Sequence, residues 1–557
     1  MTALNPCPAT ITAPSLPAGG IQAGGTGPQR DQAALDAHPD EITAAARELV
    51  AGLGTRPLGQ VSPSVYETGR LVTLAPWLTG HAERVRHLLV TQRTGGDWGV
   101  HDGYALVPTL SATEALLAES RRRSPGHARD RPAAAADRGL RALREPLRRA
   151  SGEGMPDLPA IELIVPYLVT AINGHLRAGA LPGAAPLAPP SGAAADRVAA
   201  LGAALRAGAT PPEKLLHALE VTGTAAHRAP GVRPAAGTVG ASPAATAAWL
   251  GVPGTAGLDA AAVRHLEEAA RPHGGPVPCG LPITVFERGW VLSWLARAGI
   301  RVTVPAVLTE SLAGALAPGG VAAGPGLPAD ADTTSVALYA LTLLGRPADP
   351  EGLWPFRAGP HFQTWRGEDG ASTTVNAHVL DAFRAHAARY PDASPRYAAA
   401  IAEVAGWLRA AQRPDGDWTD RWHVSPYYAT MSCALALDEL GGPAPEVAAA
   451  VRFVRESQRD DGGWGAWRST AEETAYALHV LTLTRAGRRD PGRPRACAAG
   501  RDFLLRTAEH AVHPPMWVDK DLYAPSAIIH AAVLGALALT AGLDAAAAGH
   551  PPSRIPT

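Results

Sequence analysis

The sequence predicts an almost entirely α-helical protein with more than one domain. Apolar residues recur with helical spacing along most of the chain, and almost no segment alternates with the period of two that β-strands need. One segment type, with Gln and Trp flanking a Gly/Asp turn, occurs three times. At 557 residues, the chain also exceeds the size at which a single hydrophobic core keeps growing.

The repeated segments are "QRTGGDW" from Gln92, "QRPDGDW" from Gln412 and "QRDDGGW" from Gln458. Each follows one apolar-periodic stretch and precedes another, so the unit is a helix, a turn and a second helix. The spacing of the two later copies is typical of one helical hairpin per repeat. We expect the three tryptophans to fasten successive hairpins as structural residues.

The ends of the chain and its most apolar segment predict no membrane insertion. Residues 1–38 contain neither the basic region nor the continuous apolar region of a secretory signal, and we interpret them as a disordered tail, with a second tail at 549–557. The segment 527–543 is shorter than the roughly 20 residues needed to cross a bilayer. It is predicted to be a buried core helix.

Charge and cysteine content exclude several classes of protein. A formal net charge of -1 provides no overall field that would attract nucleic acid. The four cysteines form no C-x-x-C pair, which argues against a disulfide framework and a thiolate zinc site. We therefore expect a cytoplasmic protein with a small-molecule partner. A homodimer is compatible with these features, but the oligomeric state does not follow from them.

The segment "DADTT", residues 330–334, places two carboxyls one residue apart where a Gly/Pro-rich loop becomes a helix. One interpretation is a helix N-cap, because Asp side chains accept hydrogen bonds from the free N–H groups of a first turn. The other is a paired-carboxyl acid, because burial and a neighbouring negative charge both keep a carboxylic acid protonated. These residues alone leave both interpretations open.

Ten segments in this order resemble class II terpene cyclases, the relatives of squalene–hopene cyclase and copalyl diphosphate synthase, over nearly everything after residue 40. They are "SVYETGRLVTLAPWL" (64–78), "IELIVPYL" (161–168), "LLHALE" (215–220), "SPAATAAWL" (242–250), "VPCGLPITVFERGWVL" (277–292), "DADTT" (330–334), "TTVNAHVLDAF" (373–383), "DRWHVSPYYAT" (420–430), "AEETAYAL" (471–478) and "WVDKDLYAP" (517–525). The resemblance implies an all-α fold of two α/α-barrel domains. In that arrangement residues 39–62 are the first helix of the β domain, 63–300 are an inserted γ domain, and 301–548 are the rest of the β domain.

That family protonates a terminal alkene of a linear isoprenoid, and the resulting cation is captured by successive double bonds. By resemblance, Asp332 is the general acid and Asp330 is its polarising and reprotonating partner, with Thr333 and Thr334 bonding one carboxyl oxygen. The family's usual final aspartate is Thr333 here, a variant that resembles drimenyl diphosphate synthases. We therefore expect cyclisation of farnesyl diphosphate to drimenyl diphosphate, with a copalyl or labdane-type product from geranylgeranyl diphosphate as the alternative.

The resemblance also implies roles for residues outside this motif. His217 and Asn376 match a pair that holds a water to end the reaction. Glu162 matches a Mg²⁺ ligand, Lys520 matches a group that meets phosphate oxygens, and Arg288 is a further candidate for substrate binding. Aromatic faces stabilise cations without reacting with them, and the candidates are Trp354, Phe356, Trp365, Trp422, Tyr427, Tyr428 and Tyr523. Plain core packing is the competing interpretation for each of these seven.

Three other classes of protein share some of these features. A helical-repeat binding scaffold would have many equal repeats, whereas these are few and irregular. A protein prenyltransferase β-subunit would need an Asp/Cys/His zinc site, and no cysteine has such neighbours. A triterpene cyclase acting on a hydrocarbon would have no use for Glu162 and Lys520.

Overall fold

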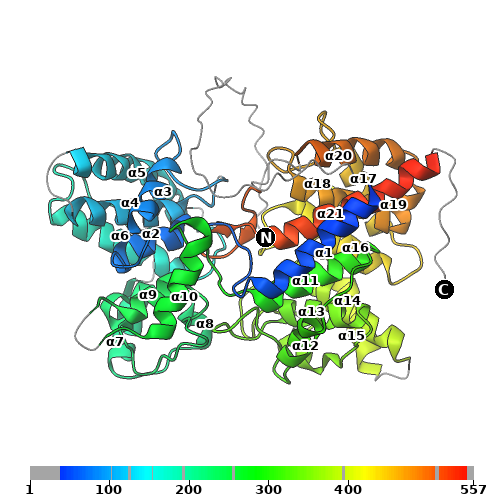
Figure 1. Ribbon diagram of the computed structural model, residues 1–557, viewed down its shortest axis with the longest axis horizontal. Helices are drawn as coiled ribbons and strands as arrows, with labels where there is room; N and C mark the ends of the chain where they lie inside the picture. Colours follow the sequence, from blue (N-terminus) through cyan, green and yellow to red (C-terminus); the bar gives the residue numbers. More distant parts are fainter. Residues whose placement is uncertain are drawn as a thin grey trace.

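The computed structural model describes residues 38–101, 103–122, 127–152, 155–190, 195–253, 257–391, 395–507 and 513–547. The predicted tail 549–557 lies outside these residues, and so does the predicted tail 1–38 except for His38, which is the N-cap of α1. The described chain is mainly helical and forms two helical lobes side by side (Figure 1). This confirms the predicted all-α fold of two α/α-barrels.

The first barrel, the γ domain, is one of these lobes. It contains α2 (Val65–Leu74), α3 (His81–Val90), α4 (Leu106–Arg122), α5 (His127–Gly152), α6 (Ile161–Arg177), α7 (Ala195–Arg206), α8 (Glu213–Leu216), η1 (Leu219–Ala226), α9 (Pro243–Leu250), α10 (Ala260–Ala270) and η2 (Arg271–His273).

The second barrel, the β domain, is the other lobe. It contains α1 (Pro39–Thr55), α11 (Thr284–Arg297), α12 (Ala306–Ala315), α13 (Ala331–Leu343), η3 (Pro350–Phe356), β1 (Arg357–Ala358), β2 (His361–Phe362), α14 (Thr373–Arg389), α15 (Pro395–Ala410), α16 (Pro426–Asp438), α17 (Pro445–Glu456), α18 (Ala471–Leu483), α19 (Arg485–Arg489), α20 (Arg493–Thr507), β3 (Trp517–Val518), β4 (Leu522–Tyr523) and α21 (Ser526–Ala547).

Helices from both ends of the described chain close the second barrel. Figure 1 shows α1 running alongside α21, and the two helices pack on each other and on α11. The buried side chains of Ile42, Leu49 and Leu53 are the face of α1 that makes this contact. The first barrel is therefore inserted between α1 and the rest of the second barrel.

Helix α11 shows that the predicted domain boundary at residue 300 lies too late in the chain. Trp290 and Trp294 of α11 are buried in the core of the second barrel, together with residues of α13 and α21. The helix is apolar on most sides, so its burial in this core is the stable arrangement. The second barrel resumes with α11 instead of after residue 300.

The three repeated turns share one set of hydrogen bonds. Trp98 is fully buried, and its Nε1 donates to the carbonyl of Leu88 at 2.7 Å in the preceding helix. Nε2 of Gln92 donates to the Gly96 carbonyl and to that of Ala135 in the next hairpin, both at 2.8 Å. The turns at Gln412 and Gln458 repeat this pattern. The prediction that these tryptophans are structural residues is confirmed.

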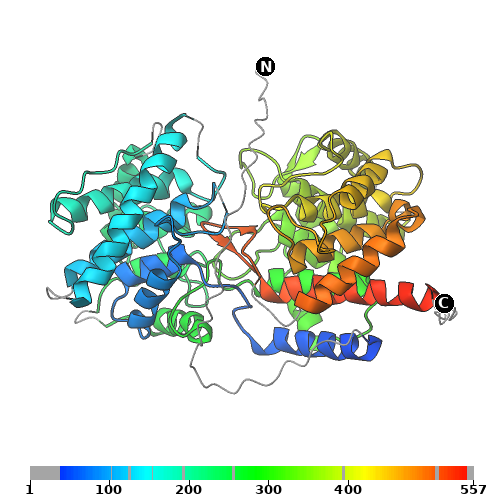
Figure 2. The same ribbon diagram turned by 90° about the horizontal axis from the view of Figure 1, so that it is seen from above.

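A two-stranded hairpin, β3–β4, joins the two barrels. In Figure 2 it lies in the space between the two lobes. Val518 and Leu522 of the hairpin are buried in the core of the first barrel. Asp521 accepts hydrogen bonds from the Ser64 hydroxyl at 3.1 Å and the Tyr66 amide at 3.2 Å. The turn of this hairpin is thus anchored in the first barrel.

Among the described residues, no helix is both long enough and apolar enough to cross a bilayer. The apolar segment 527–543 lies within α21, whose side chains Ile528, Leu534 and Leu537 are fully buried. The prediction of a buried core helix for this segment is confirmed.

Candidate active site

Asp330 and Asp332 occupy different positions at the start of α13. Asp330 is the N-cap, and its Oδ1 accepts a hydrogen bond from the Thr333 amide at 2.6 Å. Asp332 lies in the first turn and makes no cap. Burial raises the pKa of Asp330 to about 8, and the charge of Asp332 adds to this effect. Asp330 therefore combines the two roles that the sequence left open, a cap and a carboxyl that holds a proton.

The two threonines do not both bond a carboxyl oxygen as predicted. The Thr334 hydroxyl donates to the backbone carbonyl of Asp330 at 2.5 Å and accepts from the Val321 amide at 2.8 Å. Thr333 contributes its backbone amide, together with a hydroxyl that also favours the ionised form of Asp330. Thr334 thus fixes the backbone around the acid pair, since its hydroxyl has no proton left for a carboxyl.

His378 is the partner of Asp332, and the sequence analysis missed it. Its Nδ1 lies 2.6 Å from Oδ1 of Asp332, and the side chains are 10% and 13% exposed. When Nδ1 carries the ring proton, it donates to Oδ1, and a proton on Asp332 is then held on Oδ2. His378 is present in the segment "TTVNAHVLDAF", but only Asn376, two residues earlier, was interpreted as a site residue.

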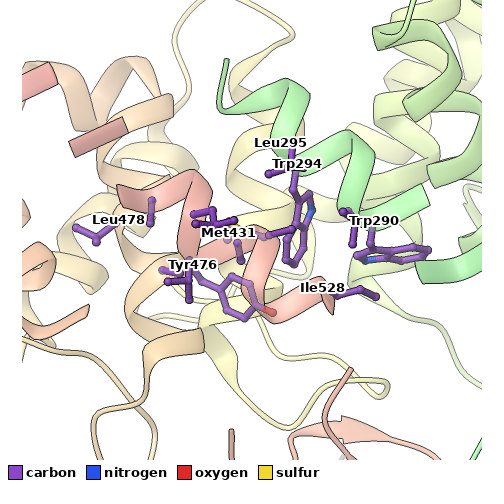
Figure 3. Close-up of a cluster of buried hydrophobic side chains, with 14 of the residues drawn as sticks. Trp290, Trp294, Leu295, Met431, Tyr476, Leu478 and Ile528 are labelled. Carbon is purple, nitrogen blue, oxygen red and sulfur yellow. The ribbon is translucent and has the colours of Figure 1, made fainter. Parts of the chain in front are cut away.

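Aromatic rings line the same region. The Trp290 ring lies edge-on to the His378 ring at 5.4 Å, and Trp290 Nε1 donates to the Tyr428 hydroxyl at 2.9 Å. The Tyr428 ring is 4.8 Å from that of Trp517 and 5.3 Å from that of Tyr476. Figure 3 shows the neighbouring buried cluster with Trp290, Trp294 and Tyr476. These rings lie around the Asp332–His378 pair, and aromatic faces are groups that can stabilise a cation.

The seven predicted aromatic residues divide into three groups. Burial raises the pKa values of Tyr428 and Tyr523, and the charge of Asp332 adds to both, so these two phenols lie near the acid. Trp422 packs edge-on to Trp365 at 5.1 Å, and its Nε1 donates to the Thr364 hydroxyl at 2.9 Å.

The third group consists of core residues. Trp354 stacks on Phe383 at 5.1 Å, Phe356 is 1% exposed, and Tyr427 packs against Phe453 at 5.4 Å. For these three the core interpretation holds, and their prediction as substrate-binding residues is not supported.

Lys520 is enclosed at the junction of the barrels. Its side chain has no exposed surface, and Nζ lies 2.6 Å from Glu67 Oε1 and 3.1 Å from Glu220 Oε1. Nζ also donates to the Ser242 hydroxyl at 2.8 Å and the His217 carbonyl at 2.7 Å. Burial opposes the ammonium charge, but the two glutamates outweigh it and raise the pKa of Lys520. This enclosure does not match the predicted position facing phosphate at a pocket mouth.

His217 and Asn376 are not a pair. His217 bonds to the Gly240 carbonyl and to Asp519 at the barrel junction. Asn376 is fully buried in the second barrel, where its amide accepts from the Phe362 N–H at 2.8 Å and donates to the Ser372 carbonyl at 2.8 Å. The prediction of a shared water is not supported, because the Asn376 amide is already bonded to the backbone of Phe362 in β2 and of Ser372.

Arg288 also has a structural position. Its guanidinium donates to the Ser311 hydroxyl in α12 and to the Leu53 carbonyl at the end of α1. These contacts connect three helices of the second barrel. The prediction of Arg288 as a substrate-binding group is therefore not supported.

Glu162 lies half-buried in the first turn of α6. Among the residues that the structure describes, no three His, Cys, Asp or Glu side chains gather to hold a metal ion. Mg²⁺ retains several waters and is commonly held by one or two carboxylates plus substrate phosphates. Glu162 fits only that arrangement, as a single ligand.

Comparisons with known proteins agree with this geometry. Residues 367–521 match the family described as the squalene-hopene cyclase C-terminal domain. An ent-copalyl diphosphate synthase from a Streptomyces species is 43% identical over 90% of this chain and 96% of its own length. A copalyl diphosphate synthase from Streptomyces cyslabdanicus is 41% identical over 90% of this chain and 96% of its own length.

A solved structure, the ent-copalyl diphosphate synthase from Streptomyces platensis, is 43% identical with a TM-score of 0.84, covering 90% of this chain and 99% of that one. The match extends over both barrels and the hairpin between them. With an acid pair beside aromatic faces and relatives of this identity over nearly its whole length, the chain belongs to the class II terpene cyclase family.

Proposed function

We propose that this enzyme cyclises geranylgeranyl diphosphate to a bicyclic copalyl-type diphosphate and retains the diphosphate. The proposal rests on sequence identity. Relatives named as copalyl diphosphate synthases are 41% to 43% identical to this chain, and each match covers 90% of it. This proposal replaces farnesyl diphosphate, the substrate expected from the Thr333 variant, as the first choice.

The reaction begins with proton transfer from Asp332 to the terminal alkene. The π electron pair forms the new C–H bond, the O–H bond of Asp332 breaks, and a tertiary cation results. Successive double bonds attack this cation to close two rings. The protonated Asp330, whose pKa is about 8, then returns a proton to Asp332. The rings of Trp290 and Tyr428 stabilise the cation without reacting with it.

The diphosphate end of the substrate is held and not ionised. We propose that Glu162 provides the protein's carboxylate for Mg²⁺ at that end. When bound, the ion neutralises the diphosphate charge. The Glu162→Gln variant is expected to bind Mg²⁺ with a higher Kd than the wild type. Calorimetry in the presence of a non-reacting substrate analogue measures this Kd.

Farnesyl diphosphate is the second candidate substrate. The observation in its favour is Thr333, which takes the place of the family's usual final aspartate. The product would then be drimenyl diphosphate, formed by the same acid with the same two ring closures.

One experiment separates these candidates. Purified enzyme and Mg²⁺ are incubated separately with the ten-, fifteen-, twenty- and thirty-carbon substrates, then treated with phosphatase and analysed by mass spectrometry. A bicyclic alcohol from the twenty-carbon diphosphate supports the proposal. A product from the fifteen-carbon diphosphate alone would overturn the proposal in favour of the drimenyl reaction. If no substrate gives a product, the result would favour a non-catalytic binding scaffold.

A further inference from the structure

Both ring nitrogens of His217 face groups that only accept hydrogen bonds. Nδ1 lies 2.6 Å from the Gly240 carbonyl oxygen, and Nε2 lies 2.7 Å from Oδ1 of Asp519. Each nitrogen must therefore carry a proton for both bonds to form. A doubly protonated imidazole has no lone pair, so His217 in this arrangement cannot accept a further proton.

The two oxygens of Asp519 are used differently. Oδ1 receives the His217 bond and a second bond from the Lys520 amide at 2.6 Å. The side chain remains 13% exposed. A Cβ added at Gly280 would lie 3.1 Å from Oδ2, closer than an ordinary contact, so this glycine leaves Oδ2 uncovered. Oδ2 is thus the oxygen of Asp519 that remains free to take a proton.

Tyr523, in the same hairpin as Asp519, lies near both this carboxylate and Asp332. Asp519 lies in the turn between β3 and β4, and Tyr523 is in β4. Burial raises the pKa of Tyr523, and the negative charges of both Asp519 and Asp332 add to the effect. The Tyr523 phenol therefore lies within electrostatic reach of both carboxyls.

We propose that Oδ2 of Asp519, and not His217, accepts the proton that ends the cyclisation, with His217 as its positioning residue. This inference rests on the proposed function. A C–H bond next to the cationic carbon breaks, its electron pair forms the new C=C bond, and the proton forms an O–H bond with Oδ2. Asp332 supplies one proton and Asp519 removes one, so the substrate and the product are isomers.

The charges around Asp519 favour a base that returns to its ionised form after each turnover. Burial opposes ionisation of Asp519, but His217 outweighs it, and with Lys520 it lowers the pKa of Asp519 to about 2. A carbocation is a far stronger acid than any carboxylic acid, so even this weak base receives its proton. At neutral pH the protonated carboxyl then loses the proton to water.

The test is the product distribution of Asp519→Asn with geranylgeranyl diphosphate. The amide keeps the size and one acceptor oxygen but cannot take the proton. The variant is expected to consume substrate while formation of the native alkene falls about a hundredfold, replaced by hydroxylated product from water capture or by alkenes with a shifted double bond. Asp519→Glu is expected to recover part of the native alkene.

His217→Gln and Asp157→Asn are the discriminating variants. The Gln amide still donates to Asp519, so His217→Gln is expected to make the native alkene more slowly. Asp157 is an exposed carboxylate that also bridges the barrels, through Arg421 at 2.8 Å, and its variant is expected to match the wild type.

Two outcomes would overturn the inference: an unchanged product from Asp519→Asn, or loss of the native alkene from His217→Gln while Asp519→Asn retains it. If Asp519→Asn does not fold, as judged by its melting temperature, the products of Asp519→Glu and His217→Gln still test whether Asp519 is the base. A wild-type enzyme that converts no isoprenoid diphosphate would refute the proposed function itself, which is a distinct result.

Discussion

The acid pair of the second barrel and the charged cluster at the barrel junction both bury carboxyls, with opposite results. Burial and the neighbouring charge of Asp332 raise the pKa of Asp330 to about 8, and the hydrogen bond from the Thr333 amide opposes this rise only in part. Asp519 is half-buried, but it bonds to His217 and adjoins Lys520, and its pKa falls to about 2. The presence of a cationic partner decides whether a buried carboxyl stores a proton or a negative charge.

The sharpest test of this contrast removes the acid. Asp332→Ala is expected to lower turnover about a thousandfold, because the variant lacks the proposed general acid. The measurement is bicyclic alcohol formed after phosphatase treatment. Asp502→Asn, an exposed aspartate on α20, is the matched control. Cyclisation retained by Asp332→Ala would move the acid elsewhere.

The second test removes the cation from the junction. Lys520→Met leaves Glu67 and Glu220 buried without their ammonium partner, and we expect a loss of about 3–5 kcal/mol in the free energy of unfolding. Urea unfolding followed by circular dichroism measures it. Lys214→Met, at an exposed position on α8, is expected to stay within about 0.5 kcal/mol of wild type. Equal stability of the two variants would contradict the cluster's structural role.

The third test concerns the partner of the acid. His378→Ala removes the donor that lies 2.6 Å from Asp332, and we expect a fall in kcat of about tenfold to a hundredfold. His378→Asn, which keeps a donor, is expected to recover part of the rate. If the alanine and asparagine variants are equally impaired, packing against Trp290 is the main role of His378.

The fourth test is a pH profile, with the smallest expected effect. The pKa of Asp330 is raised in the folded protein, so its contribution to stability is full below the unfolded pKa of about 4 and is lost as the pH rises through about 8. We expect kcat/KM to fall over the same upper range, since the ionised Asp330 cannot return a proton. The Asp330→Asn variant is expected not to show this fall of kcat/KM at high pH. A wild-type kcat/KM that stays constant up to about pH 9.5 would rule out Asp330 as the group that returns the proton.

The helical spacing of apolar residues and the Gln–Trp turns predicted the fold well, because both depend on residues that are close together in the sequence. Trp98 and Gln92 bond within one hairpin and to its neighbour, so a short segment contains all the information. The acid pair was predictable for the same reason. The boundary at α11 was missed because an apolar helix can join either core, and only its contacts with α13 and α21 decide.

The rest of the site could not be read from sequence because its partners are distant in the chain. Asp519 lies about 300 residues beyond His217, and nothing in "LLHALE" indicates a carboxylate. Lys520, between two aspartates, has the pattern of a surface turn and is nevertheless fully buried. A motif predicts which residue types are present, but which charges become neighbours depends on how the hairpin docks between the barrels.

The pairing of α1 with α21 has a consequence for synthesis of the chain. The second barrel cannot close until α21 has been made and has met α1, so its closure is a contact of very high sequence separation, which slows folding. Most of the first barrel lies between them and can begin to fold while the ribosome is still working, although the β3–β4 hairpin that completes its core is made late. During that interval the apolar faces of α1 and α11 lack their partner helix α21. A chaperone that binds exposed apolar helices would therefore bind the chain at this stage.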